Sequence, residues 1–175
     1  MIDLWKQVMH LENQRRDCVV EWDDGIDIDA LLLTHIKQWY AHQLNNAPVQ
    51  QLPIVNLASQ VPINTRDGIV IATVPQQCVR PVEWKLAEWH RSVTEFIDPC
   101  SHEAMLQLNE WSRGGAYNPA IIDYGFQMLL MSTASSSPQL ELARCVVRPA
   151  DGSYQFHSDL LSTIPEWSQS VPQLL

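Results

Sequence analysis

The chain has 175 residues, of which 46% belong to the hydrophobic set and 18% are charged. This length suits one domain, or one domain with an attached arm, and it suffices for a hydrophobic core. The composition is too apolar for a disordered chain. The net charge of -9 disfavours nucleic acid as a partner, because such binding relies on cationic contacts to phosphates. We therefore expect a folded protein without sequence-specific nucleic-acid binding.

The N-terminal stretch MIDLWKQVMHLENQRRD lacks the basic start, the continuous apolar segment and the small-residue cleavage site of a signal peptide. The longest apolar segments are LLL and the interrupted IIDYGFQMLLM, both far shorter than the roughly 18 to 20 apolar residues of a spanning helix. We expect a cytoplasmic protein with no membrane partner.

Two helices are expected in the N-terminal third, one over about residues 2–14 and one beginning near Ile28. In both, apolar residues recur at steps of three and four, which places them on one side of a helix. The positions are Leu4, Val8 and Leu11 in the first helix and Ile28, Leu31, Leu32, Ile36, Trp39, Tyr40 and Leu44 in the second. Asn45, Asn46 and Pro48 are expected to end the second helix.

The acidic segment EWDDGIDID before the second helix has two interpretations. Its aspartates, Asp23, Asp24, Asp27 and Asp29, offer the hard oxygen ligands that calcium takes. Their spacing does not match an EF-hand loop. The start of a helix explains them more simply, since Asp27 can cap the first turn and Asp29 complements the positive end of the helix dipole. We expect no metal here.

From residue 52 onward the sequence changes to short β-rich runs with prolines. Asp67-Gly68 lies between two such runs, and this dipeptide is typical of a tight hairpin turn. Apolar and charged residues then alternate over 82–86, which predicts a half-buried strand. Val82, Trp84 and Leu86 are expected to face the core, with Glu83 and Lys85 toward solvent or a neighbouring subunit.

The segment 89–97 is compatible with strand or helix. A helix is predicted from Ser101 to about Trp111, with the Ser101 hydroxyl as its cap and Gly114 and Gly115 as its end. Further strands are predicted at 120–133, 139–148 and 153–157, with a turn at 150–152. The proline-interrupted tail is predicted to be an arm.

The sequence does not match the common motifs for metal binding, nucleotide binding or catalysis. His102 and Glu103 resemble the start of HExxH, but Leu106 occupies the position of the second histidine. The sequence contains no GxSxG, GxGxxG or GxxxxGK[ST]. The other histidines, His10, His35, His42, His90 and His157, are scattered, and we expect them to be surface or packing residues.

The cysteines are Cys18, Cys78, Cys100 and Cys145, too widely spaced for a zinc knuckle or a disulfide framework. We expect buried thiols. A Cys-His nucleophile stays formally open for the last three, although nothing in the sequence places a base beside them. We predict no catalytic, cofactor-binding or metal-binding residues, no cofactor and no enzymatic activity. An enzyme remains conceivable only if scattered His, Asp and Cys residues converge in the fold.

Tryptophan is unusually frequent, with seven in the chain. Core packing is the first explanation, and Trp84 fits it. Tryptophan is also enriched at the energetic centres of protein interfaces. We therefore expect exposed tryptophan or leucine near 84–111 or 160–175 to lie at a contact with another chain.

Four stretches taken in order, LPIVNLA, TRDGIVIATVPQQCVRPVEWKLAEWHRSVTEFI, LNEWSRGGAYNPAIIDYG and LELARCVV, resemble ring or connector proteins of crAss-like gut bacteriophages over about residues 50–148. The shared order is a helix, an LP step, a strand into a proline, an Arg before a Trp-bearing strand, and a polar-Arg-Gly turn. Cys78 and Val79 depart from it, since acidic and aromatic residues are expected before Arg80. The resemblance implies a virion or prophage protein that forms a ring between capsid and tail, with no active site.

The sequence thus predicts the α+β class, with N-terminal helices followed by a mostly antiparallel β-sheet of about five to seven strands and one short inserted helix. We expect a single domain over 1–161 and a C-terminal arm over 162–175, which the sequence leaves open as either ordered or flexible. The predicted function is a non-enzymatic head-to-tail connector-type subunit, with itself and other structural proteins as partners, in the cytoplasm or in a virion. The alternative is a small soluble protein- or ligand-binding module of a gut bacterium.

Overall fold

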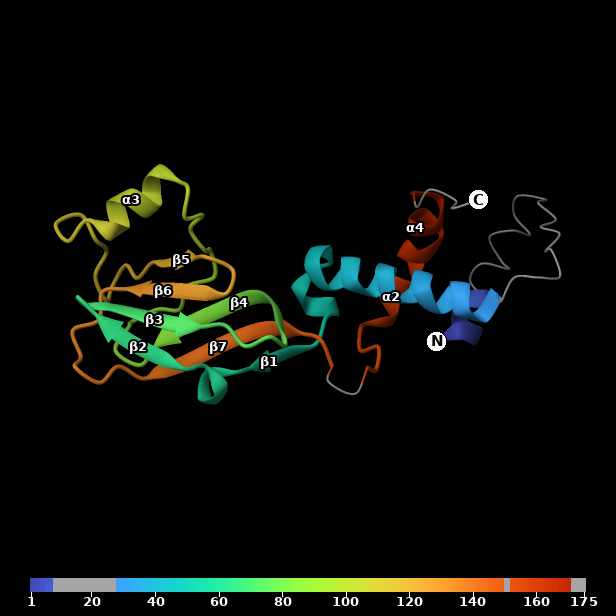
Figure 1. The fold of residues 1–175 in the computed structure, drawn as a ribbon, viewed down its shortest axis with the longest axis horizontal. Helices are drawn as coiled ribbons and strands as arrows, with labels where there is room; N and C mark the ends of the chain where they lie inside the picture. The colour runs from blue at the N-terminus through green and yellow to red at the C-terminus, as the bar shows by residue number, and fades with distance from the viewer. Residues whose placement is uncertain (8–27, 150–151, 171–175) are drawn as a thin grey trace. The chain divides into compact units, whose positions relative to one another are not determined.

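The computed structural model describes residues 1–7, 28–149 and 152–170. It has the predicted α+β class, with helices and two sheets of antiparallel strands (Figure 1). The residues group into two compact units, one formed by Met1–Pro53 with Pro149–Leu175 and the other by Ile54–Arg148. Compactness does not test independent folding, so the expected single domain over residues 1–161 stays a prediction. None of the helices in the described part of the chain has the length and apolarity needed to cross a membrane.

The first unit is organised by α2, Ile28–Asn46. This helix confirms the predicted end, and residues 2–7 are also helical. Residues 8–14 and the expected cap Asp27 lie outside the described residues, and Ile28 is the first described residue after that gap, so the predicted start of the second helix stays a prediction. Trp39 is fully buried on α2, and its ring meets those of Trp5 and Phe156 edge to face, at centroid distances of 5.6 and 5.2 Å. Its indole N–H donates to the Thr163 hydroxyl at 3.0 Å. The aromatic residues of distant segments therefore form one core.

The predicted strand at 153–157 is wrong. The segment makes no sheet, because its aromatic side chains pack on α2 instead: Tyr154 lies edge to face on Tyr40 at 5.2 Å, and Phe156 lies on Trp39. The chain continues as the 3-10 helix η3, Ser158–Thr163, and the helix α4, Ile164–Ser170. Ile164 is fully buried, so the expected arm begins as a packed helix; 171–175 lie outside the described residues.

The second unit contains the strands in two sheets rather than the single sheet that we expected. One sheet has the order β1-β7-β4 and the other β2-β3-β6-β5, all paired antiparallel. The strands are β1 Ile54–Asn56, β2 Ile63–Arg66, β3 Ile69–Thr73, β4 Cys78–Leu86, β5 Ile121–Asp123, β6 Gln127–Met131 and β7 Leu140–Val147. The 3-10 helix η2, Ala58–Gln60, follows β1 in the chain, and the 3-10 helix η1, Val49–Gln51, belongs to the first unit.

The two sheets share one hydrophobic core. It joins Val70 and Leu130 of the four-stranded sheet to Trp84, Leu86 and Cys145 of the three-stranded sheet. Trp84 and Leu86 are fully buried and Val82 is half-buried, in agreement with the prediction that these three side chains face the core. Two facing sheets bury the inner faces of both, which explains why so many strand residues are apolar.

The predicted hairpin at Asp67-Gly68 is confirmed. β2 and β3 pair from Ile63 opposite Ala72 to Arg66 opposite Ile69, which leaves two residues for the turn. Both have positive φ, 52° and 73°, as a tight turn of this length requires.

The predicted strand at 120–133 is divided in two. β5 and β6 form a second hairpin, and its turn contains Gly125 at φ 80°, whose N–H donates to the Asp123 carboxylate at 2.6 Å. Ile121 and Leu130 belong to the core between the sheets, whereas the neighbouring Ile122 and Met131 belong to a second cluster. Both faces of these strands are therefore apolar, which removes the alternation that reveals a strand in a sequence.

Segment 89–97 is neither strand nor helix. It touches the sheets at isolated bridges, where Val93 pairs with Trp84 and Ile97 with Ile122. Helix α3, His102–Leu108, follows with the predicted Ser101 cap, whose hydroxyl accepts from Ala104 N–H at 3.1 Å. α3 ends before Trp111 because polar side chains take over its last backbone groups: the Ser112 hydroxyl, for example, donates to the Leu106 carbonyl.

Candidate protein-contact surface

Helix α3 lies beyond β5 at the edge of the four-stranded sheet (Figure 1). Only one of its side chains, Ala104, is fully buried, in the second cluster with Ile97, Ile122 and Met131. Because Ala104 is the one fully buried side chain of this helix, most of the surface of α3 lies in solvent. That exposed surface carries several large apolar side chains.

Five large apolar or aromatic side chains of α3 and the following loop are exposed, and we call them the α3 patch. Trp111 is 93% exposed, Tyr117 79% and Met105 68%. The complete patch is Met105, Leu106, Leu108, Trp111 and Tyr117. Single exposed apolar residues are ordinary, whereas a cluster of this kind is typical of an interaction site. Trp84 and Trp89 are buried, so within the predicted region 84–111 the exposed tryptophan is Trp111.

The loop that carries Trp111 is held by its own hydrogen bonds. The Arg113 guanidinium donates to three carbonyl oxygens, those of Gln107 at 3.1 Å, Leu108 at 3.4 Å and Asp67 at 3.2 Å. The guanidinium thus satisfies the end of α3 and ties it to the β2–β3 turn. The Trp111 N–H in turn donates to the Asn109 side chain at 3.0 Å.

Gly114 completes this loop for a steric reason. A Cβ at this position would lie 2.3 Å from the Asn118 carbonyl oxygen, so no other residue fits without movement of the backbone. Its N–H donates to the Gln107 side chain at 2.9 Å. Tyr117 is also oriented, because its ring stacks on that of His90 at a centroid distance of 4.0 Å and an angle of 11°. The backbone that carries Trp111 and the ring of Tyr117 are therefore held in defined positions.

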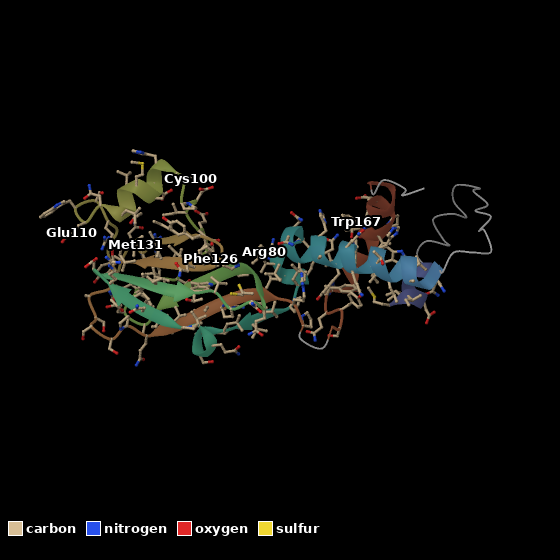
Figure 2. All side chains as sticks on the ribbon, in the orientation of Figure 1. Arg80, Cys100, Glu110, Phe126, Met131 and Trp167 are labelled. Atoms are coloured by element: carbon tan, nitrogen blue, oxygen red, sulfur yellow. The ribbon has the colours of Figure 1, made fainter. Side chains whose placement is uncertain are left out.

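The patch has an acidic border. Glu103 and Glu110 belong to the same helix and loop as the patch, and Figure 2 shows Glu110 and Cys100 at opposite ends of α3. Glu95 and Asp98 lie on the preceding segment. None of these four carboxylates takes part in an ion pair within the described residues. Two guanidinium groups lie in the same region, Arg113 hydrogen-bonded to the carbonyls above and Arg91 to the Asn118 side chain, so the four carboxylates exceed the nearby positive charges by two.

An open cavity of about 510 Å³ lies between α3 and the segment that precedes it. Its polar lining includes Arg91, Glu95, Asp98, Glu103 and Gln107, and Phe96, Pro119 and Ala120 contribute apolar surface. Glu103 and Gln107 are its lining residues from α3, and the cavity is open to solvent.

Two of the three described cysteines lie together in the core, a contact that the sequence did not reveal. Cys78 and Cys145 share a hydrogen bond, which, together with burial, raises the pKa of Cys78 far above its ordinary value. The same bond lowers the pKa of Cys145. No histidine donates to or accepts from these thiols in the described residues, so the structure supplies neither with the base that a nucleophile needs.

The structure describes only some of the residues that were considered as metal ligands. Asp23, Asp24 and Asp27 lie outside the described residues. Within the described ranges, no three His, Cys, Asp or Glu side chains converge as metal ligands would. His42 packs against the ring of Trp167 at 4.8 Å, and His102 is exposed at the start of α3.

Sequence reasoning missed the exposed Phe126, which lies in the β5–β6 turn. Figure 2 shows it at the end of β6 away from Met131, and Glu110 lies at the Met131 end. Phe126 is therefore separate from the α3 patch. Gly125 was the available signal, since a glycine within a β-rich run marks a turn or bulge.

No model of a known protein family matches the sequence, and no curated protein matches it either.

Glu83 is expected to make the free energy of unfolding depend on pH. The Ser92 hydroxyl donates to its carboxylate at 2.7 Å and Arg144 at 2.9 Å, and these bonds lower the pKa of Glu83 below its ordinary value of 4.5. A lowered pKa in the folded state stabilises the protein above the unfolded pKa, and this contribution disappears as the pH falls through the folded value. We expect the difference in unfolding free energy between wild type and Glu83→Gln to shrink between about pH 6 and pH 3.

Urea denaturation at several pH values measures that difference. Ser92→Ala is the matched control, since it removes the first of the two bonds and leaves the carboxylate in place, so it should reduce the pH dependence without abolishing it. A difference that stays constant down to pH 3 or so would show that the carboxylate is not stabilised in this way.

Proposed function

We propose that this chain is a non-enzymatic structural protein that works through contacts with other chains, as a head-to-tail connector-type subunit of a phage or prophage. The observation that carries the proposal is Trp111, a tryptophan almost wholly in solvent on a loop held by Arg113 and Gly114. The similarity of residues 50–148 to connector proteins supports the more specific role. The protein would be found in the cytoplasm and then in the virion.

Exposed aromatic side chains on a hydrogen-bonded loop favour a contact surface over a catalytic site. Tryptophan and tyrosine bury much apolar area with few rotatable bonds, so they bind at a low entropic cost. The α3 patch presents both, together with methionine and leucine. A connector subunit meets its own copies through a heterologous contact and meets other structural proteins as well, so it needs more than one such surface. The α3 patch supplies one of them.

Self-association is the property that tests this role. The net charge of -9 opposes contact between copies at low ionic strength. We therefore expect multi-angle light scattering to show larger species as the concentration rises from the micromolar to the millimolar range, and more of them at high salt, where repulsion is screened. A strict monomer over this range at both low and high salt would contradict the homo-oligomeric role.

The cavity beside α3 favours a second candidate, a small protein- or ligand-binding module. Its volume of about 510 Å³ lies within the range of ordinary ligand sites, and it combines polar with apolar lining. A small molecule that raises the melting temperature of the monomer in proportion to its concentration would favour this alternative. The connector role predicts no such ligand.

A further inference from the structure

The charges around the α3 patch indicate what kind of partner it accepts. Glu103, next to the patch on α3, and Glu110, next to Trp111, are exposed carboxylates without an ion-pair partner in the described part of the chain. Arg91 and Arg113 of the same region keep their positive charge while they hydrogen-bond to uncharged groups of the chain. The four carboxylates of Glu95, Asp98, Glu103 and Glu110 outnumber these two guanidinium groups, so the region has a net negative charge.

We propose that the α3 patch binds a cationic, apolar segment of a different protein, in which an aliphatic or aromatic side chain packs on Trp111 and lysine or arginine pairs with Glu103 and Glu110. This inference rests on the proposed assembly role and specifies the partner for one surface. The arrangement follows the general anatomy of interfaces, with an aromatic centre and a polar border that selects the partner by charge.

A second copy of the chain fits this surface poorly. The chain contains 20 acidic and 11 basic residues, so another copy brings a net negative charge to an acidic border. In the second unit, Lys85 already pairs with Glu141 at 2.7 Å and Arg144 with Glu83 at 2.9 Å. Like charges brought together at an interface select against a partner. The complementary partner is therefore a basic one.

The cavity beside α3 carries more negative than positive charge. Three carboxylates, those of Glu95, Asp98 and Glu103, line it together with one guanidinium, that of Arg91. A lysine or arginine side chain is long enough to enter such an opening while its apolar stem contacts Phe96. The cavity and the patch would then act as one surface, with the cation at the cavity and the apolar side chain at Trp111.

Two peptide probes test the proposal with the full chain. The first is a short amphipathic helical peptide of leucine and lysine, and the second is its twin with glutamate in place of lysine. Binding is followed by the NMR shifts of the backbone amides of α3 and of the Trp111 indole N–H. We expect the lysine peptide to shift these signals, to bind at least about tenfold more tightly than its twin, and to weaken as salt is added.

Variants locate the binding on the patch. Trp111→Ser should weaken the lysine peptide about tenfold or more, as the loss of a central aromatic does. Glu110→Lys should also weaken it, whereas Glu166→Lys, an equal change of charge on α4 of the first unit, should not. Equal weakening by both charge variants would reduce the effect to net charge and overturn the proposal. So would equal affinity for the two peptides, shifts confined to other residues, or no binding.

The proposed self-association and the proposed binding of a cationic partner can be tested separately, because added salt should strengthen the first and weaken the second. A chain that assembles at high salt but ignores the lysine peptide would overturn the cationic partner and leave the assembly role standing. A chain that binds the peptide at the patch but stays monomeric would support the cationic partner and contradict the homo-oligomeric role. Concentration-dependent shifts of Trp111 without any peptide would show that a second copy occupies the patch, which also overturns the proposal.

Discussion

Trp84→Ala is expected to lower the free energy of unfolding by about 3 to 5 kcal/mol, as the removal of a large buried aromatic does. Trp84 is fully buried between the two sheets, in the same cluster as Leu86 and Cys145. The substitution leaves a cavity at the point where β4 and β7 meet. Urea denaturation followed by circular dichroism gives the total change, and amide hydrogen exchange on β4 and β7 shows where stability is lost.

Trp111→Ala is the matched control for Trp84→Ala. It removes the same number of atoms from a residue that is 93% exposed, so the stability should change by less than about 0.5 kcal/mol. Glu83→Ala is a second comparison on the same strand, because its half-exposed ion pair with Arg144 contributes only about 0 to 1 kcal/mol. Equal losses of unfolding free energy for Trp84→Ala and Glu83→Ala would mean that the side chains of β4 assigned to the core and to solvent are wrongly assigned.

Trp39→Ala is expected to destabilise the first unit by a similar amount, about 3 to 5 kcal/mol. Trp39 is fully buried and joins α2 to two other segments, through Trp5 near the N-terminus and Phe156 near the C-terminus. The loss should appear as faster hydrogen exchange in α2 and η3. Unchanged exchange in these helices would contradict the aromatic core described for this unit.

Trp39→Phe separates packing from hydrogen bonding at this site. Phenylalanine keeps most of the apolar volume but cannot donate to the Thr163 hydroxyl, which Gln43 also approaches at 3.2 Å. We expect it to cost about 1 to 2 kcal/mol, clearly less than alanine. A phenylalanine variant as unstable as the alanine variant would show that the hydrogen bond, rather than the ring, holds the segments together.

The elements that the sequence predicted correctly depend on local chemistry. The steps of three and four around Ile36, Trp39 and Leu44 define α2, and the Asp67-Gly68 turn defines the first hairpin. Ser101 caps α3 through a hydrogen bond that spans only three residues. Each of these features is decided within one or two turns of chain, so the residues concerned lie next to one another in the sequence.

The predictions that failed depend on partners far along the chain. Segment 153–157 has the composition of a strand, yet its aromatic residues pack on α2, more than a hundred residues earlier, as the hydrogen bond of Tyr40 to Gln155 shows. β4 pairs with β7 rather than with its sequence neighbour β3, which produces two sheets. The exposure of Trp111 was equally hidden, because tryptophan is found more often inside a protein than in solvent.

By itself the sequence determined the α+β class, the positions of α2 and α3, the first hairpin and the inward direction of Trp84. Only the tertiary structure decided which tryptophans are buried, that two thiols meet in the core, and that Met105, Trp111 and Tyr117 are exposed on α3 and the loop after it. The physical reason is that periodicity, caps and turns are local properties of the backbone, whereas burial and exposure depend on which distant segments pack together. The candidate contact surface is therefore a property of the fold.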